Sequence, residues 1–390
     1  MTALLLLLLT LAAAEPKTPQ QLATEARAAY DRKAWPEYLA LNEQLAVLRP
    51  NHPVVIFNHA GALALNGRPD DAMRELQRLG AMELVLDLSD PDLDSLRSRA
   101  DFRAVEARMR DVAATPVAKS SVAFRIPSKE LTTEAITYDA KTGASFVSSV
   151  RKRKILRIAR DGSITDFITT GIWGSNGLGV DVKRRILYAT STASERSDGY
   201  AKEVDVALFA FDLDSGKVIA RYAAPAEGRH YFDDLTVADD GAVYVSDASG
   251  AIYRLKDGKL AEFAKGMRSP QGSAIRGGAL YVADYSGAIW SVDLRSGKTK
   301  ALELPSDFAA VGIDGMELHG DALIAIQNGV NPHRIVRLAL KGERVTSWQV
   351  LERNHPAMDE PTLGVVVGGD LYYVAASGGH KEAVVLRLPL

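Results

Sequence analysis

Residues 242–258 read AVYVSDASGAIYRLKDG, and residues 279–297 repeat the pattern as ALYVADYSGAIWSVDLRSG. In both stretches an alternating apolar strand leads through a glycine-containing turn into a second strand, which ends at another glycine. A period of two is typical of β-strands, and glycine beside aspartate or serine favours tight turns. The two stretches therefore predict consecutive antiparallel strand pairs of the same design.

The same unit occurs six times in the second part of the chain. Its second strand begins at residues 144, 185, 242, 279, 322 and 370. Six units with three or four strands each are typical of a β-propeller, and a β-sandwich would not repeat this order six times. We expect SVAFRIP, residues 121–127, to close the ring as an outer strand beside VVLRLPL, residues 384–390.

The part of the chain before residue 119 has a helical pattern, in which alanine and leucine recur at three- and four-residue spacing between prolines. Positions 34 apart match in character, for example Ala26 with Ala60, and 34 residues is the tetratricopeptide period. We expect a small all-α, tetratricopeptide-like domain over residues 15–118, with a generic helical hairpin as the alternative. It precedes an all-β six-bladed β-propeller over residues 119–390.

The chain starts with MTALLLLLLTLAAAE, in which the apolar run ends in three alanines. That run is too short to span a bilayer, which takes about 20 apolar residues, and it resembles a cleaved secretory signal. We predict a signal peptide over residues 1–14, cleavage before Glu15, a periplasmic or secreted protein, and no membrane span.

Composition excludes several classes of function. The chain has 47 basic and 49 acidic residues, so no basic face is expected and no nucleic-acid partner is predicted. It contains no cysteine, which excludes disulfides, thiolate nucleophiles and cysteine zinc sites.

Each unit also has an innermost strand, and these strands start with polar residues. In a propeller the innermost strands line the central channel, so their starts should meet at one mouth. Oxygen ligands without histidine or cysteine suit a hard cation such as Ca²⁺ or Mg²⁺, which would also relieve repulsion between crowded acids. The alternative is that turn chemistry alone selects these residues. They are Glu134, Asn176, Asp233 with Asp234, Gln271, Asp314 and Thr362.

Four motifs carry a resemblance to a known family: TEAITYD, YFDDLTVADDGAVYVSD, SPQG and GIDGMEL, which begin at residues 133, 231, 269 and 312. They resemble the six-bladed propellers of the senescence marker protein (regucalcin), gluconolactonase and luciferin-regenerating enzyme family. The resemblance implies a divalent metal on the axis, usually Ca²⁺. Its ligands would be Glu134, Asp314 and Gln271, the last at a position where the family has asparagine.

The resemblance and the polar ring together suggest roles for further residues. Asp233 stands where the family has a substrate-contacting asparagine, and we expect it to act as the catalytic base. Its neighbour Asp234 should face the other side of the strand, because side chains alternate. Tyr231 stands where sugar-lactone enzymes often have arginine, and we assign it to substrate binding with Asn176 and His230.

Two functions from different classes follow. The first is a metal-dependent hydrolase of a small lactone or ester, with a small-molecule substrate and a divalent cation at the propeller axis. The second is a non-catalytic propeller that binds a small ligand or a protein partner, with the helical domain as the interaction module. A purely structural metal or a metal-free channel is a third alternative.

Overall fold

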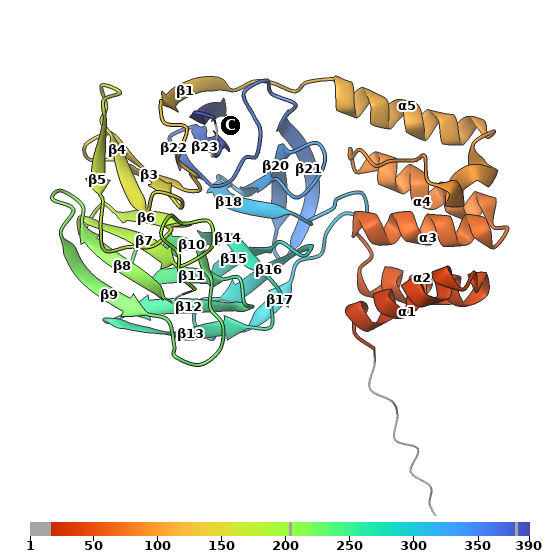
Figure 1. Ribbon diagram of the computed structural model, residues 1–390, viewed down its shortest axis with the longest axis horizontal. Helices are drawn as coiled ribbons and strands as arrows, with labels where there is room; N and C mark the ends of the chain where they lie inside the picture. Colours follow the sequence, from red (N-terminus) through yellow and green to blue (C-terminus); the bar gives the residue numbers. More distant parts are fainter. Residues whose placement is uncertain (1–16, 203–204, 379–380) are drawn as a thin grey trace, which may run out of the picture.

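The computed structural model describes residues 17–202, 205–378 and 381–390, and it contains a six-bladed β-propeller beside a small helical domain (Figure 1). The predicted fold class is confirmed. The predicted signal peptide, residues 1–14, lies outside the described residues. Within the described ranges, no helix has both the length and the apolar character needed to cross a membrane.

The helical domain is built from paired helices. The first four α-helices each carry a proline in their first turn, where a missing N–H costs nothing. α3 begins 34 residues after α1, and α4 begins 34 residues after α2, so the period seen in the sequence separates two helix pairs. The elements are α1 (Pro19–Asp31), α2 (Trp35–Leu48), α3 (Pro53–Leu65), α4 (Pro69–Ala81), the 3-10 helix η1 (Pro91–Leu96) and α5 (Ala100–Ala114).

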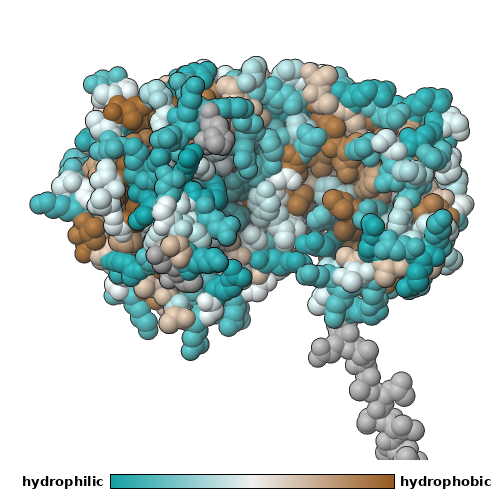
Figure 2. All heavy atoms as spheres, in the orientation of Figure 1, coloured by the Kyte–Doolittle hydropathy of each residue, from teal (hydrophilic) through white to brown (hydrophobic). Residues whose placement is uncertain are grey.

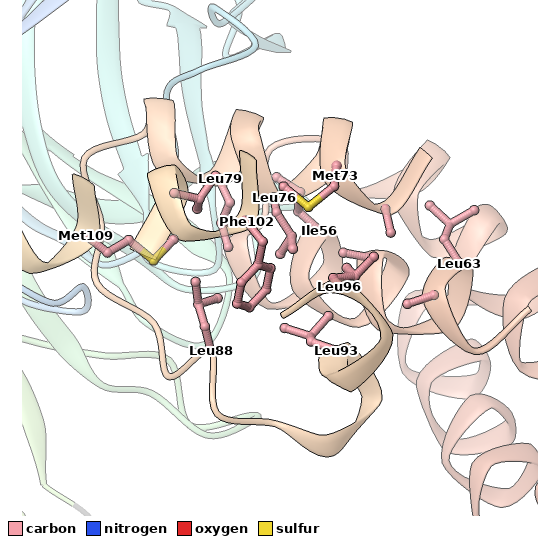
Figure 3. Packing of buried hydrophobic residues seen from close by; sticks show 14 of the residues in the cluster. Ile56, Leu63, Met73, Leu76, Leu79, Leu88, Leu93, Leu96, Phe102 and Met109 are labelled. Atoms are coloured by element: carbon pink, nitrogen blue, oxygen red, sulfur yellow. The ribbon is translucent and has the colours of Figure 1, made fainter. Parts of the chain in front are cut away.

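An apolar cluster joins α3, α4, η1 and α5 (Figure 3). Phe102 of α5 is fully buried in it, together with Leu76 of α4 and Leu93 of η1. The cluster also contains Ala309, which belongs to the propeller. The helical repeat therefore buries part of its apolar surface on the neighbouring domain, as an isolated pair of repeats must.

Six four-stranded antiparallel sheets form the blades. The first three blades, from the innermost strand outward, are β2 (Ile136–Asp139), β3 (Ala144–Ser149), β4 (Lys154–Ile158), β5 (Ile164–Ile168); β6 (Leu178–Asp181), β7 (Ile186–Thr192), β8 (Val206–Asp212), β9 (Val218–Ala223); and β10 (Phe232–Val237), β11 (Val243–Asp247), β12 (Ala251–Lys256), β13 (Lys259–Lys265).

The last three blades are β14 (Pro270–Arg276), β15 (Ala279–Asp284), β16 (Ala288–Asp293), β17 (Thr299–Ala301); β18 (Ile313–His319), β19 (Ala322–Gln327), β20 (Arg334–Lys341), β21 (Arg344–Arg353); and β22 (Gly364–Val367), β23 (Asp370–Ala376), β24 (Ala383–Pro389) with β1 (Ser121–Ile126). The second strands begin within one residue of the positions expected from the sequence.

The ring is closed by β1, which forms the outer strand of the sixth blade. It pairs antiparallel with β24, with Val122 opposite Leu386 and Arg125 opposite Val384. This confirms the closure predicted from SVAFRIP. The pairing covers the edge of β24, which would otherwise offer unpaired backbone groups.

The helical domain docks on the fifth blade through a buried arginine. Arg334, at the start of β20, is fully buried and donates to the backbone oxygen of Met82 at 2.7 Å and to Gln327 Oε1 at 2.8 Å. The Val85 N–H donates to the Asn331 oxygen at 2.7 Å. Figure 2 shows hydrophobic residues gathered where the two domains adjoin, on a face that is otherwise mostly hydrophilic.

Candidate functional site

The innermost strands β2, β6, β10, β14, β18 and β22 all start at the same end of the central channel. We call this end the mouth. Direct contacts join residues from neighbouring blades there. Thr362 Oγ1 donates to the backbone oxygen of Glu134 at 2.7 Å, and Asn176 Nδ2 donates to the backbone oxygen of Phe232 at 3.4 Å. The structure thus brings the predicted polar ring together at the mouth, from Glu134, Asn176, Asp233, Gln271, Asp314 and Thr362.

A β-bulge at the start of β10 changes how its two aspartates point. Phe232 pairs with Asp247 and Leu235 with Val245, so β10 has one extra residue here. Asp233 and Asp234 both raise the pKa of Asp314, after the larger effect of burial. Asp234 also lines the cavity that the innermost strands enclose. Its carboxyl therefore faces the axis, and the expectation that it faces the other side is wrong because the bulge breaks the alternation.

Three carboxyl groups crowd the mouth, those of Glu134, Asp233 and Asp314, and burial raises the pKa of each. The charge of Glu134 raises the pKa of both aspartates further. The pKa of Asp233 reaches about 7, which suits a group that exchanges protons near neutral pH. The charge of one acid therefore acts on the others across the mouth.

Arg196 brings a positive charge to the mouth, and the sequence reasoning missed it. It lies in the loop between β7 and β8, and its Nη2 donates to Glu134 Oε1. Its guanidinium also forms a hydrogen bond with the Tyr231 side chain. The one available signal was the 57-residue spacing between the second strands at 185 and 242, which indicates a long insertion.

Asp314 is held by a short chain of hydrogen bonds that the sequence reasoning also missed. Asn328 Nδ2 donates to Asp314 Oδ2 at 2.5 Å, and the Tyr285 hydroxyl donates to Asn328 Oδ1 at 3.0 Å. Asn328 directly follows Gln327, the partner of the buried Arg334. The helical domain therefore supports the same loop that orients Asp314.

The neutral members of the ring keep oxygen atoms available. Asn176 is buried and uses its amide nitrogen, while Gln271 Nε2 donates to Ser269 Oγ at 3.4 Å. A hydrogen bond from Gln271 also lowers the pKa of Asp233 against the larger effects of burial and neighbouring acids. Both amides thus donate through nitrogen, which leaves their carbonyl oxygens as acceptors.

His230 is placed beside the mouth with both ring nitrogens occupied. Nδ1 lies 2.6 Å from Asp247 Oδ2, and Nε2 lies 2.8 Å from the Glu227 oxygen. Asp247 Oδ1 also accepts from the Tyr231 N–H at 3.0 Å. In this arrangement His230 anchors the segment that carries Tyr231, and Tyr231 is the group that reaches Arg196.

Beyond the mouth, the innermost strands enclose a channel cavity of about 440 Å³. Asp234 and Glu317 line it. Burial raises the pKa of Asp234 to about 7, and burial together with the charge of Asp234 raises the pKa of Glu317 to about 8. The Ser273 N–H donates to Asp234 Oδ2 at 3.3 Å.

The donor chemistry of the mouth fits a hard divalent cation. Glu134, Asp314 and Gln271 offer carboxylate and amide oxygens, and mutual repulsion among the acids favours a cation. Among the described residues, no three histidine, aspartate or glutamate side chains are grouped so that they could hold one ion. A cation here would therefore depend on two carboxylates and on amide oxygen, and it would meet Glu134 in its ion pair with Arg196.

Comparison with known proteins identifies the fold. No family model and no curated protein matches the sequence. Solved structures that match include the PQQ-bound aldose sugar dehydrogenase of Streptomyces coelicolor, with 16% identity, 70% of this chain and 99% of that chain covered, and a TM-score of 0.51. A gluconolactonase-like protein matches with 18% identity, coverage of 69% and 92%, and a TM-score of 0.51. Luciferin-regenerating enzyme matches with 12% identity, coverage of 70% and 95%, and a TM-score of 0.51. All of these matches leave the helical domain largely outside, and they show that residues after it form a propeller of this general fold.

Proposed function

We propose that this protein is a hydrolase of a small lactone or ester, and that it uses a divalent cation, most simply Ca²⁺, at the propeller mouth. The observation that carries the proposal is the convergence of Glu134, Asp314, Gln271 and Asp233 at one end of the channel. The propeller enzymes among the similar structures, including a gluconolactonase-like protein, support an enzymatic role.

The mouth residues divide into ligands and a proton acceptor. Glu134, Asp314 and Gln271 would hold the cation, which would supply a Lewis acid for the carbonyl oxygen of the substrate. Asp233 would accept a proton from water, since its pKa of about 7 leaves it partly deprotonated at neutral pH. Tyr231 and Arg196 border the same space and would bind oxygen atoms of the substrate, with Asn176 behind them.

The reaction class follows from what the mouth offers. The chain has no cysteine, so a thiolate cannot attack the substrate, and its carboxylates are better suited to activating water than to redox chemistry. A lactone or ester is the simplest substrate whose carbonyl such a site can hydrolyse.

A panel of lactones and esters tests this proposal. The protein is stripped with a chelator, and turnover is measured without metal and after addition of Ca²⁺, Mg²⁺, Mn²⁺ or Zn²⁺. We expect turnover of at least one substrate to require a cation. Turnover that chelation leaves unchanged would reject the metal mechanism, and no turnover across the panel would reject the hydrolase.

The second candidate is a binding function, in which the helical domain recruits a protein. It is favoured by three large apolar side chains exposed around the turn between α2 and α3, those of Val47 (80% exposed), Leu48 (51%) and Val54 (54%). Both candidates are compatible with export to the periplasm or the medium, which we also propose, and which N-terminal sequencing of the native protein would test.

A further inference from the structure

Two arginines meet at the rim of the mouth, one from each domain. Arg49 follows α2 in the helical domain, and its Nη2 donates to the Ser286 oxygen at 2.9 Å. Ser286 in turn donates its N–H to Asp284 Oδ1 at 3.0 Å, while the N–H of Arg268 donates to Asp284 Oδ2 at 2.8 Å. One buried carboxylate therefore organises the loop positions that hold both arginines.

These loops also hold residues of the mouth. Ser269, next to Arg268, accepts a hydrogen bond from Gln271. Tyr285, next to Ser286, donates to Asn328, which orients Asp314. Arg268 is thus one residue from Ser269, and Arg49 bonds to Ser286, which is one residue from Tyr285.

The positive charge of the pair is balanced only in part. The charge of Asp284 raises the pKa of Arg49, although backbone N–H groups of Arg268, Ser269 and Ser286 and the Trp290 indole already bond to this carboxylate. Within the described part of the chain, neither Arg49 nor Arg268 forms a salt bridge. Burial and the charge of Arg268 both lower the pKa of Arg49, as expected for like charges close together.

A third donor lies beside them. His52, the residue before α3, packs against Gly287 of the same turn. Its Nδ1 is buried and has no hydrogen-bond partner among the described residues. Burial, with the charges of Arg49 and Arg268, lowers the pKa of His52 to about 4. The ring is therefore neutral at pH 7 and can donate one N–H to an acceptor.

We propose that Arg49, Arg268 and His52 form an anion subsite at the rim of the mouth, and that it binds a carboxylate or phosphate group of the ligand. Guanidinium groups match the paired oxygens of both anions. The subsite rests on its own contacts. Its assignment to the substrate rests on the proposed hydrolase, whose substrates would then be lactones or esters that also carry an anionic group.

The position of the subsite gives the helical domain a direct role in recognition. Arg49 reaches the propeller loop at Ser286 only because the turn after α2 lies against that loop. The helical domain would then form one wall of the ligand site. The propeller would form the opposite wall and supply the reactive groups.

Binding of simple anions tests the subsite without any turnover. Sodium phosphate and sodium acetate are titrated into the full-length protein at constant ionic strength, with sodium chloride as the reference salt. We expect a saturable rise of the melting temperature with at least one of them. A stronger response to phosphate would indicate phosphate esters as ligands, and a stronger response to acetate would indicate carboxylates.

Variants then identify the residues. Arg268→Gln removes a side chain that makes no hydrogen bond within the described residues, so the fold should persist, and anion affinity should fall about tenfold. Arg268→Lys should keep part of the anion affinity, because lysine retains the positive charge. Arg221→Gln is the matched control. Arg221 lies on β9, the outer strand of the second blade, and the substitution breaks its exposed ion pair with Asp205. Equal responses of wild type and Arg268→Gln, or responses no larger than with chloride, would overturn the proposal. Anion binding without hydrolysis would leave the subsite standing and reject only its link to the reaction.

Discussion

Two acidic regions lie along the same propeller axis, and they are built differently. At the mouth, Glu134 bonds to the Arg196 guanidinium and Asp314 to a side-chain amide. In the channel beyond it, Asp234 and Glu317 receive hydrogen bonds from backbone N–H groups, and no positive side chain of the described residues acts on them. A side-chain partner can move away when a ligand binds, so a carboxylate at the mouth can present its charge to that ligand. A backbone N–H donor stays in place and only reduces the free-energy cost of burying the carboxylate. The comparison predicts that substitutions at the mouth affect ligands and turnover, and that those in the channel affect stability.

The largest effect is expected for Asp233→Asn. Removing the proton acceptor should reduce turnover about a hundredfold, the usual scale for a general base, while the fold persists. The measurement is the rate on whichever lactone or ester the wild type hydrolyses. Unchanged turnover in a folded variant would remove Asp233 from the mechanism and weaken the distinction between mouth and channel.

The next effect concerns the cation. Ca²⁺ should raise the melting temperature of the wild type, because a ligand that binds only the folded state stabilises it. Glu134→Gln or Asp314→Asn should remove most of this rise, since each replaces a charged ligand by a neutral one. Glu317→Gln, the channel control, should leave the rise intact. If the channel variant loses the response and the mouth variants keep it, the two regions have been assigned the wrong way round.

The fold was largely predictable because its signal is repeated. Strand alternation and glycine turns recur in every blade, so an error in one unit is corrected by the other five, and the expected start at 370 matches β23. The closing strand was predictable as well, since residues 121–127 had an alternating pattern and no other partner.

The site was predictable only where it lies on strands. Glu134 and Asp314 follow from the register of innermost strands, whereas Arg196 and Asn328 come from loops whose course depends on packing between blades. The orientation of Asp234 depends on a bulge, which inserts one residue without any sequence rule that fixes its place. Arg49 reaches the propeller loop at Ser286 through docking of the domains, which no local pattern reveals.

A moderate effect on stability is expected for Glu317→Gln, and it depends on pH. The pKa of Glu317 is raised to about 8 in the folded protein, against about 4.3 in an unfolded chain. Between these values the unfolded chain releases the proton and the folded protein keeps it, so stability falls as pH rises from about 4 to about 8. The glutamine variant should escape this fall and gain stability over wild type at pH 8, by at most about 5 kcal/mol for the full shift, with little difference at pH 4. Urea unfolding at both pH values measures this difference in the free energy of unfolding. Glu382→Gln, at an exposed glutamate, is the control. A gain that is equal at both pH values would contradict a titrating carboxyl.

The smallest effect is expected at Asp234, where two substitutions separate charge from hydrogen bonding. The pKa of Asp234 is raised to about 7 by burial, so stability again falls as pH rises, over a narrower range than for Glu317. Asp234→Asn should therefore gain at most about 4 kcal/mol over wild type at pH 8 relative to pH 4. Asp234→Ala should instead lose about 1 kcal/mol at pH 4, because the Ser273 N–H loses its acceptor. This loss should shrink or reverse at pH 8, since alanine also removes the titrating carboxyl. Neither variant should alter the Ca²⁺ response or turnover by more than a fewfold amount if the channel is structural. A loss of turnover comparable to that of Asp233→Asn would mean that the bulge presents both aspartates to the substrate, and the boundary between mouth and channel would then lie deeper, between Asp234 and Glu317.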